Sequence, residues 1–446
     1  MRFALLLGFC ASLLAVVLLA AFVLRPPWSW AVGLVYIGYD TWLLFHMVRA
    51  SRRAVAAPLR LASGGPRPTL AVVIAARNER EILPQALDAI LSQADLPDEL
   101  LIVDDGSTDG TREMLERDYA PRSPLLRVLA KEASGKARSL NEALAQVTSD
   151  LFVTIDADTV LDAGALGALR AAFQNEPDLA AACGVLRPRC RPSAFSRAFE
   201  LYQTFEYLRG FLWRVVWSCE DTLVLVSGAF AAFRRERLVE VGGFDPLSLV
   251  EDYELMFRLH RRSLEERGSP LHARVIGDAR AITDCPGRLN LFLKQRTRWF
   301  AGYLETMFQS AKMVGNRRYG RLGTFHLPLK TVDMLLPVFG LAAIVALLVQ
   351  LAVGQRPGGV VLFALLFKFS FDLSCHFYAL VLHARWLKKR ITPGFALRAI
   401  AATLTEPVGF QLVRQFGALL GWLAFLRGRI EWTPQRERTP ELPRVT

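Results

Sequence analysis

Long apolar segments at the two ends of the chain constrain its fold most strongly. Residues Ala4–Leu24 carry no charge and exceed the roughly 20 residues that an α-helix needs to cross a bilayer. A second run, Trp28–Val48, follows and is interrupted only by Asp40 and His46. A cleaved signal peptide would explain the first run alone, but its apolar core spans only about 7–15 residues. We therefore expect residues 1–50 to form a retained transmembrane hairpin.

The C-terminal third carries further apolar runs at Val332–Val353, Val360–Leu382 and Phe395–Leu426. The first two are long enough to span a bilayer. The third is interrupted by charged residues and by Glu406-Pro407, so it forms either one kinked span or two shorter interfacial helices. We expect transmembrane helices over residues 329–426 and a basic tail over residues 427–446, and the side on which the tail lies stays open.

The net charge of +12 does not indicate nucleic-acid binding, because the basic residues gather beside apolar runs. Clusters of this kind mark the cytosolic side of a membrane protein. They are Arg49, Arg52, Arg53, Arg60 and Arg67, within or beside a linker over residues 51–68, and Arg385, Lys388, Lys389 and Arg390. The six cysteines include no Cys-x-x-Cys pair, so a structural zinc site is not expected. We expect a multi-pass protein of the cell membrane with its central region in the cytosol.

The central region, residues 69–287, alternates between short apolar runs and segments of helical periodicity. Continuous apolar runs of this length are typical of strands buried on both faces. The expected strands are Leu70–Ala75, Glu99–Val103, Leu126–Ala130 and Leu151–Ile155. The expected helices between them are Glu81–Ser92, Thr111–Arg117 and Lys136–Gln146. This alternation predicts an α/β fold with a mostly parallel sheet.

Two segments, Ser193–Ser218 and Arg288–Val314, combine many aromatic residues with basic ones. Helices of this composition suit the membrane interface, and residues 288–328 are expected to form such interfacial helices. The alternative is that both segments are buried helices of the catalytic domain.

Two pairs of acidic residues follow expected strands. Asp104-Asp105-Gly106 ends one strand, where ligands of open α/β sheets bind, although an ordinary turn before a helix cap explains the same residues. Asp156-Ala157-Asp158 ends another, and carboxylates two positions apart on extended backbone point to the same side. Two such carboxylates could share Mg²⁺ or Mn²⁺ with phosphate oxygens.

Further along the chain lie Glu251-Asp252 and the pentapeptide Gln295-Arg296-Thr297-Arg298-Trp299. On a helix, positions 295, 298 and 299 share one face. Arg298 offers a planar fork for phosphate oxygens, Trp299 an apolar face for a sugar ring, and Gln295 a partner for a hydroxyl group. The alternative for Trp299 is an anchor at the membrane interface.

A polar stripe inside one apolar run is formed by Lys368, Asp372 and His376. Ionisable residues in a membrane rarely face lipid. The stripe is either part of a polysaccharide path or an ion pair that only packs helices.

These acidic and basic-aromatic motifs, in this order and framed by apolar spans, resemble the family 2 glycosyltransferases that make polysaccharides in membranes, such as the cellulose, hyaluronan and poly-N-acetylglucosamine synthases. The resemblance covers about Leu70 to Trp432. It implies an α/β GT-A-like nucleotide-sugar domain inserted between N-terminal and C-terminal transmembrane helices. It also implies inverting sugar transfer from a nucleotide-sugar donor, a UDP-sugar in our reading, with Mg²⁺ or Mn²⁺.

The resemblance also implies roles for particular residues. Asp252 matches the general base, and it could also cap the helix expected at Tyr253–Arg262. Lys136 matches a lysine that contacts the donor diphosphate, although it could equally be a solvated residue at a helix start. The donor-binding set is Ala76, Arg77, Glu79, Asp104, Asp105, Lys136, Asp156 and Arg298. The acceptor-binding set is Ser227, Gly228, Gln295 and Trp299, and the metal ligands are Asp156 and Asp158.

The preferred function is processive synthesis of a β-linked extracellular polysaccharide. The alternatives are transfer of a single sugar to a lipid acceptor and a non-catalytic membrane component of a secretion complex. The expected partners are a nucleotide-sugar donor, a growing glycan or lipid acceptor, the lipid bilayer, and export or regulatory proteins, but no nucleic acid. The sugar and its linkage do not follow from the sequence.

Overall fold

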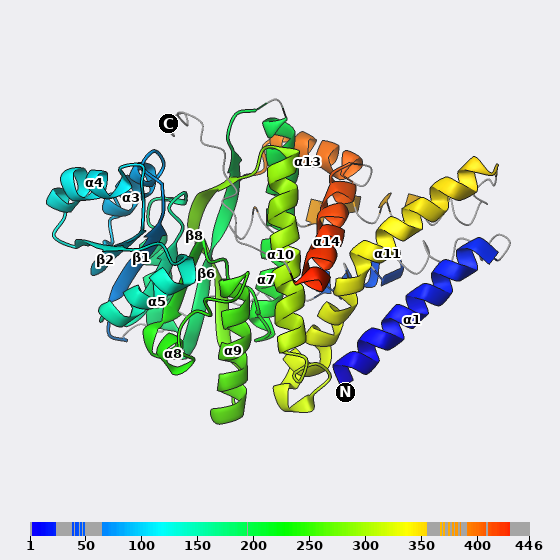
Figure 1. The fold of residues 1–446 in the computed structure, drawn as a ribbon, viewed down its shortest axis with the longest axis horizontal. Helices are drawn as coiled ribbons and strands as arrows, with labels where there is room; N and C mark the ends of the chain where they lie inside the picture. The colour runs from blue at the N-terminus through cyan, green and yellow to red at the C-terminus, as the bar shows by residue number, and fades with distance from the viewer. Residues whose placement is uncertain are drawn as a thin grey trace. The chain divides into compact units, whose positions relative to one another are not determined.

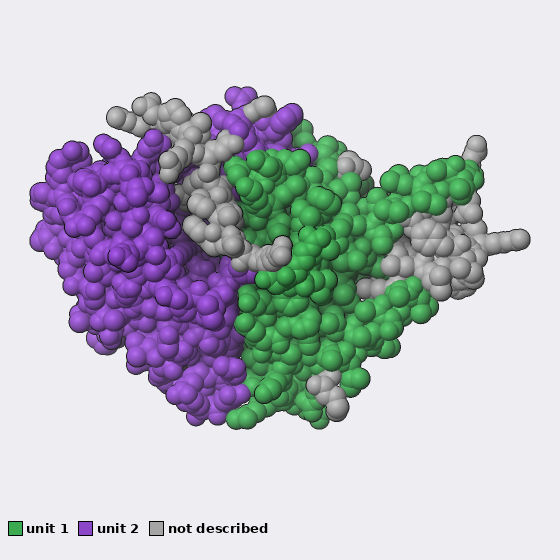
Figure 2. Space-filling view, viewed as in Figure 1, with its two compact units in different colours: residues 1–57, 208–216, 289–433 green, residues 58–207, 217–288, 434–446 purple. Residues whose placement is uncertain are grey.

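The computed structural model describes residues 2–23, 65–193, 195–354, 390–406 and 409–428, together with isolated residues between 38 and 49 and between 366 and 384. The chain divides into two compact units, coloured separately in Figure 2. The first, here called the helical unit, comprises residues 1–57, 208–216 and 289–433. The second, the sheet unit, comprises residues 58–207, 217–288 and 434–446.

Within the described residues, the sheet unit is built on one sheet of eight strands (Figure 1). The strands are β1 (Leu70–Ala76), β2 (Glu99–Asp105), β3 (Leu126–Lys131), β4 (Leu151–Ile155), β5 (Val160–Leu161), β6 (Leu179–Cys190), β7 (Phe230–Arg234) and β8 (His272–Cys285). Their order across the sheet is β3-β2-β1-β4-β7-β6-β8-β5. The helices of this unit are α3 (Leu83–Leu91), α4 (Thr111–Met114), α5 (Lys136–Gln146), α6 (Ala165–Asn175), α8 (Arg235–Glu240) and α9 (Glu251–Glu266).

The first half of the sheet is parallel, as the sequence predicts. β1 pairs with β2 on one side and with β4 on the other, and β2 pairs with β3, all in parallel. All residues of β4 are buried, as are most of β1 and β2, which explains their continuous apolar runs. The helix α5 packs on β1 and β2. The expected strands and helices of this half are therefore confirmed, with α5 and β4 at the predicted bounds.

The second half adds antiparallel strands to a sheet in which four of the seven strand pairings between described residues are parallel. β7 runs antiparallel to both β4 and β6, and β5 runs antiparallel to β8, whereas β6 and β8 are parallel. The sheet is therefore mixed. The sequence did not predict β6 because the run Ala180-Ala181-Ala182 follows its first residue, Leu179, and alanine has little intrinsic preference for strands. Burial between neighbouring strands decides its conformation instead.

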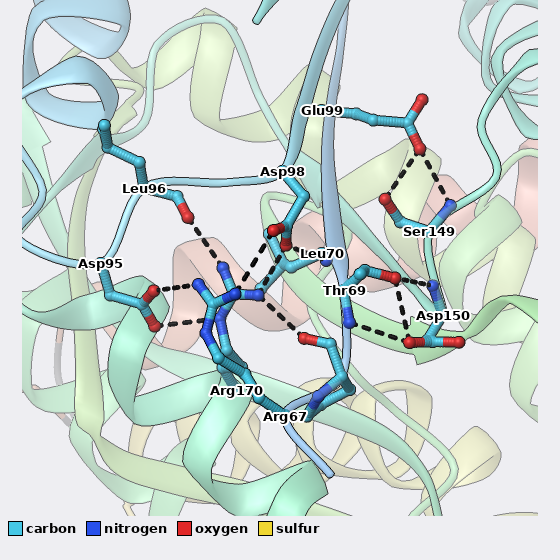
Figure 3. A network of polar contacts seen from close by, with 11 residues as sticks. Arg67, Thr69, Leu70, Asp95, Leu96, Asp98, Glu99, Ser149, Asp150 and Arg170 are labelled. Atoms are coloured by element: carbon cyan, nitrogen blue, oxygen red, sulfur yellow. Dashed lines mark hydrogen bonds and ion pairs between the residues drawn. The ribbon is translucent and has the colours of Figure 1, made fainter.

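A network of ion pairs ties the amino ends of β1, β2 and β4 together (Figure 3). The buried Arg170 donates to Asp98 Oδ2 at 2.6 Å, and the same oxygen accepts the backbone N–H of Leu70 at 2.7 Å. Asp150 Oδ2 accepts the backbone N–H of Thr69 at 2.8 Å. These contacts fix the strands that carry the acidic motifs at their opposite, carboxyl ends.

The helical unit contains α1 (Arg2–Val23), α10 (Leu289–Gln309), α11 (Leu327–Ala352), α13 (Pro393–Thr405) and α14 (Phe410–Arg427), and it also takes residues 208–216 of α7 (Ser196–Cys219). α1 packs along α11, and the ring of Phe3 meets that of Phe308 at 5.1 Å between centroids. Trp422 Nε1 of α14 donates to the Met334 carbonyl of α11 at 2.8 Å. These segments are helical, as expected, and their transmembrane or interfacial roles stay predictions. Phe292 of α10 is fully buried, which favours packing inside the protein for that face of the helix.

One described helical stretch, Leu322–Ala342, is long and apolar enough to cross a bilayer. The pair α13 and α14, bent by 58°, would form a second if it makes one broken span, by length and composition alone. The polar stripe of Lys368, Asp372 and His376 lies outside the described residues, as do the linker up to residue 64 and the tail after residue 428.

Candidate functional site

The strand order reverses direction at β1, which has β2 on one side and β4 on the other. Ligands of open α/β sheets bind outside the carboxyl ends of the strands at such a reversal. The antiparallel β7 begins at the same edge, because Phe230 pairs with Ile155 and Asp156 N donates to the Ala229 carbonyl at 3.2 Å. The topology therefore brings the residues that follow β1, β2 and β4, and those that precede β7, to one edge of the sheet unit.

The loop after β1 is fastened to the loop after β2 by Asn78. This residue has a φ of 58°, a conformation that asparagine tolerates better than most residues. Its Oδ1 accepts the Thr108 N–H at 2.8 Å, and its own N–H donates to Ser107 Oγ at 2.9 Å. Asn78 is not among the site residues expected from the sequence. Beside it, Ala76 is buried, Arg77 is exposed and Glu79 is half-buried, and their donor-binding roles stay predictions.

The adjacent carboxylates at the end of β2 have different surroundings. Asp105 accepts hydrogen bonds from the N–H groups of Ser134 and Gly135 at 2.8 Å each and from Ser139 Oγ at 3.1 Å. Asp104 accepts the Ser107 N–H at 3.4 Å through Oδ2, whereas its buried Oδ1 has no hydrogen-bond partner among the described residues. Asp105 therefore holds the start of α5, and Asp104 retains an oxygen for a ligand.

Lys136, the first residue of α5, lies among three carboxylates. Its Nζ is 2.7 Å from Asp156 Oδ1 and 3.1 Å from Glu251 Oε1. Burial alone would lower the pKa of Lys136, but the negative charges of Asp156, Glu251 and Asp252 outweigh it and raise that pKa. Lys136 is therefore a cation held between carboxylates at the sheet edge, with 31% of its side chain exposed, and its role toward the donor diphosphate stays a prediction.

Asp156 and Asp158 follow β4 and flank Ala157. Asp156 keeps 33% of its side chain exposed, whereas Asp158 is buried and its Oδ1 accepts the hydroxyls of Thr159 and Thr283 at 3.3 Å each. Among the described residues, no group of three or more histidine, cysteine or acidic side chains could hold a metal ion. One or two carboxylates nevertheless suit Mg²⁺ or Mn²⁺ when phosphate oxygens complete the shell, and hydroxyl groups that orient a ligand carboxylate are typical of such sites.

Asp252 lies in the first turn of α9, whose N-cap is Val250. The alternative that Asp252 is the N-cap is therefore wrong, since the helix begins earlier, at Glu251. Asp252 Oδ2 accepts the Gly228 N–H at 2.8 Å, and Oδ1 accepts the Tyr253 N–H at 2.8 Å. Burial and then the charge of Glu251 raise the pKa of Asp252, against the opposing effects of these two bonds and of Lys136.

Gly228 leaves little room above the Asp252 carboxylate. A Cβ at this position would lie 3.2 Å from Asp252 Oδ2 and 3.3 Å from Asp252 Cβ. The half-buried Ser227 precedes it. The sequence therefore has glycine where a backbone N–H must approach the carboxylate closely.

The pentapeptide lies in α10 of the helical unit. Gln295 is 8% exposed, and its Oε1 has no hydrogen-bond partner in the described part of the chain. Arg298 and Trp299 are half-buried. The guanidinium carbon of Arg296 is 4.5 Å from the centre of the Trp299 ring. The roles predicted for Gln295, Arg298 and Trp299 stay predictions, and the sequence analysis assigned none to Arg296.

Comparison with known proteins gives a consistent result. Residues 71–241 match the family model described as Glycosyl transferase family 2. Poly-beta-1,6-N-acetyl-D-glucosamine synthase of Staphylococcus aureus strain COL is 29% identical over 239 residues, which cover 53% of this chain and 55% of the relative. The Staphylococcus epidermidis synthase of the same name is 28% identical over 242 residues, or 54% of this chain and 56% of the relative. The chain thus spans about half the length of the curated relatives it matches.

A mannosyltransferase from Pyrobaculum calidifontis, solved in complex with GDP-Man and Mn²⁺, has a similar fold. The TM-score is 0.61 at 21% sequence identity, and the match covers 90% of this chain and 98% of the other. The predicted GT-A-like fold is confirmed, with a mixed sheet.

Proposed function

We propose that this chain, whose residues 71–241 match the family 2 glycosyltransferase model, is an inverting, metal-dependent membrane glycosyltransferase that uses a UDP-sugar. Its product is a β-linked polysaccharide made processively. The observation that carries the proposal is the cluster of Lys136, Asp156, Glu251 and Asp252 at the strand-order reversal. It combines a fixed cation for a diphosphate with a carboxylate whose pKa is raised.

The donor half of the site comes from the ends of the first parallel strands. The unpartnered Oδ1 of Asp104 can accept a hydrogen bond from the uracil ring or the ribose. Asp105 acts indirectly, because its bonds to Ser134 and Gly135 place Lys136 at the start of α5. The ammonium group of Lys136 then contacts the diphosphate.

Asp156 and Asp158 would hold Mg²⁺ or Mn²⁺. When bound, the ion neutralises charge on the diphosphate leaving group. Asp158 would be the buried ligand of the two, and hydrogen bonds from the hydroxyls of Thr159 and Thr283 orient its carboxylate. Support for a divalent ion comes from the donor chemistry and from the Mn²⁺ in the mannosyltransferase complex.

Asp252 acts as the general base. An acceptor hydroxyl oxygen attacks the anomeric carbon as the bond from that carbon to the diphosphate oxygen breaks, and Asp252 takes the hydroxyl proton. The attack comes from the face opposite the leaving group, so the configuration inverts. A raised pKa brings a carboxylate closer to the operating pH, where general bases are most effective, and the bonds from Gly228 and Tyr253 fix its orientation.

The acceptor roles belong to Gln295 and Trp299, with Arg298 directed to phosphate oxygens, as the motif implies. Ser227 and Gly228 border the acceptor beside Asp252. We place the chain in the cell membrane as a multi-pass protein. The apolar stretch Leu322–Ala342 and the bent pair α13 and α14 support insertion in the membrane, and the basic clusters beside the apolar runs favour a cytosolic sheet unit. The staphylococcal relatives, named as polysaccharide synthases, support a polymeric product.

A donor screen tests the proposal. The purified full-length protein is incubated with labelled UDP-N-acetylglucosamine, UDP-glucose and GDP-mannose, with and without Mg²⁺ or Mn²⁺. We expect metal-dependent transfer from one of the UDP-sugars. Transfer only from GDP-mannose would contradict the donor assignment, and the absence of transfer and of donor hydrolysis from every donor would favour the non-catalytic alternative.

A further inference from the structure

Arg296 lies between two aromatic rings of its own helix. Its guanidinium carbon is 4.5 Å from the centre of the Phe292 ring and 4.5 Å from the centre of the Trp299 ring. These residues lie four positions before and three positions after Arg296, so all three share one face of α10. Arg296 is only 8% exposed. A planar guanidinium stacked on rings in a water-poor setting is held more strongly than one at the surface.

This contact restricts what Trp299 can do. The guanidinium covers one face of the indole, so a sugar ring has at most the other face on which to stack. The contact also limits rotation of the indole about its side-chain torsions, because a different rotamer would separate the ring from the cation. The orientation of the remaining face therefore depends on Arg296.

The backbone of Arg296 is itself fixed by glycines of α14. A Cβ at Gly417 would lie 2.7 Å from Arg296 Cβ. A Cβ at Gly421 would lie 2.8 Å from Phe300 Cβ and 3.0 Å from the Thr297 carbonyl oxygen. Small residues four positions apart allow two helices to approach closely. Gly417 and Gly421 thus allow α14 to pack closely against the turn of α10 that carries the pentapeptide.

We propose that Arg296 is a positioning residue that orients the Trp299 indole toward the acceptor sugar, and that Gly417 and Gly421 keep Arg296 in place. The proposal rests on the proposed function, since it takes Trp299 as the acceptor platform. Arg296 acts through Trp299 and need not touch the substrate. It differs in this from Arg298, whose predicted partner is a phosphate.

The first test measures the freedom of the Trp299 ring without any enzymatic assay. Acrylamide quenching is recorded for the wild type, Arg296→Met and Arg296→Lys, each with and without Trp299→Phe, so that the Trp299 signal is obtained as a difference. We expect the quenching constant of Trp299 to rise at least about twofold in Arg296→Met, because this variant loses one desolvated cation–π contact. The rise should be smaller in Arg296→Lys, which retains a cation. An unchanged constant in Arg296→Met would overturn the proposal.

The second test separates acceptor binding from donor binding. With UDP-N-acetylglucosamine as the donor and short N-acetylglucosamine oligosaccharides as the acceptor, Arg296→Met should raise the KM for the acceptor about tenfold. The KM for the donor should stay within about twofold, because Arg298 is retained. An acceptor KM that does not change while Trp299 becomes more accessible would overturn the link to the acceptor. A wild type that uses no donor would refute the proposed function instead, and the quenching test still decides the role of Arg296.

Matched variants control for general damage. Arg122→Met removes a guanidinium that lies 4.8 Å from the centre of the Tyr119 ring in the sheet unit, and it should change neither measurement. Gly417→Ala should reproduce the effects of Arg296→Met, whereas Gly394→Ala should not, because a Cβ at Gly394 meets no atom within 4 Å. Alanine forms helices better than glycine at both positions, so helix propensity cannot explain a defect. A defect in acceptor binding that occurs only in Gly417→Ala therefore reports the close approach of α10 to α14. Equal changes in quenching and acceptor KM from Gly417→Ala and Gly394→Ala would refute the role of Gly417 in holding α10 close to α14.

Discussion

Replacing Asp252 by asparagine separates its catalytic role from its structural one. The carboxylate accepts the N–H groups of Gly228 and Tyr253, each at 2.8 Å, on different oxygens. Asparagine has a single carbonyl oxygen, so one of these donors loses its acceptor. That loss costs about 1–3 kcal/mol of folding free energy. The protein should therefore still fold, with a modest fall in its melting temperature.

The catalytic effect should be larger. Loss of a general base lowers turnover by about 10²–10⁴-fold, which corresponds to about 3–5 kcal/mol in activation free energy. The donor contacts of Asp104 and Lys136 are untouched, so UDP affinity should stay near that of the wild type. The assay combines the initial rate of transfer, UDP binding by calorimetry and thermal unfolding of the full chain in detergent.

A second carboxylate serves as the control. Asp150 accepts the backbone N–H of Thr69 at the amino edge of the sheet, so Asp150→Asn perturbs a comparable bond away from the proposed chemistry and should leave turnover within about twofold of the wild type. Normal turnover in Asp252→Asn would remove Asp252 from the mechanism. Equal losses in both variants would assign its effect to folding.

The remaining predictions concern charge, space, stability and metal. The base must be deprotonated to act. Glu251→Gln removes a charge that raises the pKa of Asp252 and should shift the acid limb of the pH–rate profile to lower pH, whereas Lys136→Met removes a charge that lowers this pKa and should shift the limb to higher pH. Shifts in the same direction would contradict the proposed cluster. Gly228→Ala should displace the carboxylate by a few tenths of an ångström and lower turnover about tenfold without changing UDP affinity. Arg170→Met should destabilise the sheet unit by about 3–5 kcal/mol, seen as lost hydrogen-exchange protection in β1, and unchanged protection would refute it. Excess chelator should stop transfer and added Mg²⁺ or Mn²⁺ should restore it, so full activity in chelator would refute the metal assignment.

The parallel half of the sheet could be predicted from the sequence because its strands are buried on both faces. The sequences of β1 and β4 are largely continuous apolar runs. The structure places α5 and β4 at the predicted bounds. The mixed half, with strands β5 to β8, could not be predicted. The Ala180-Ala181-Ala182 run of β6 has no strand periodicity, and it becomes a strand only because β7 and β8 pair with it.

The acidic motifs of the site could be found from their positions after strands, but their partners could not. Lys136 meets Glu251 across more than a hundred residues of sequence, and only the sheet topology brings them together. Asp104 and Asp105 are neighbours in the sequence, yet one retains an unpartnered buried oxygen and the other binds the start of α5. A side chain's hydrogen-bond partners depend on tertiary packing, which composition and spacing do not encode.

The central claim, that the chain polymerises sugar and delivers the product across a membrane, is tested most directly by the length and location of the product. The purified protein is reconstituted in vesicles with its sheet unit outside and supplied with labelled UDP-N-acetylglucosamine and Mg²⁺. We predict a long polymer inside the vesicles, protected from added glycosidase until detergent is present. A lipid that bears one added sugar, with no labelled polymer in the lumen, would contradict the claim and favour the lipid-acceptor alternative.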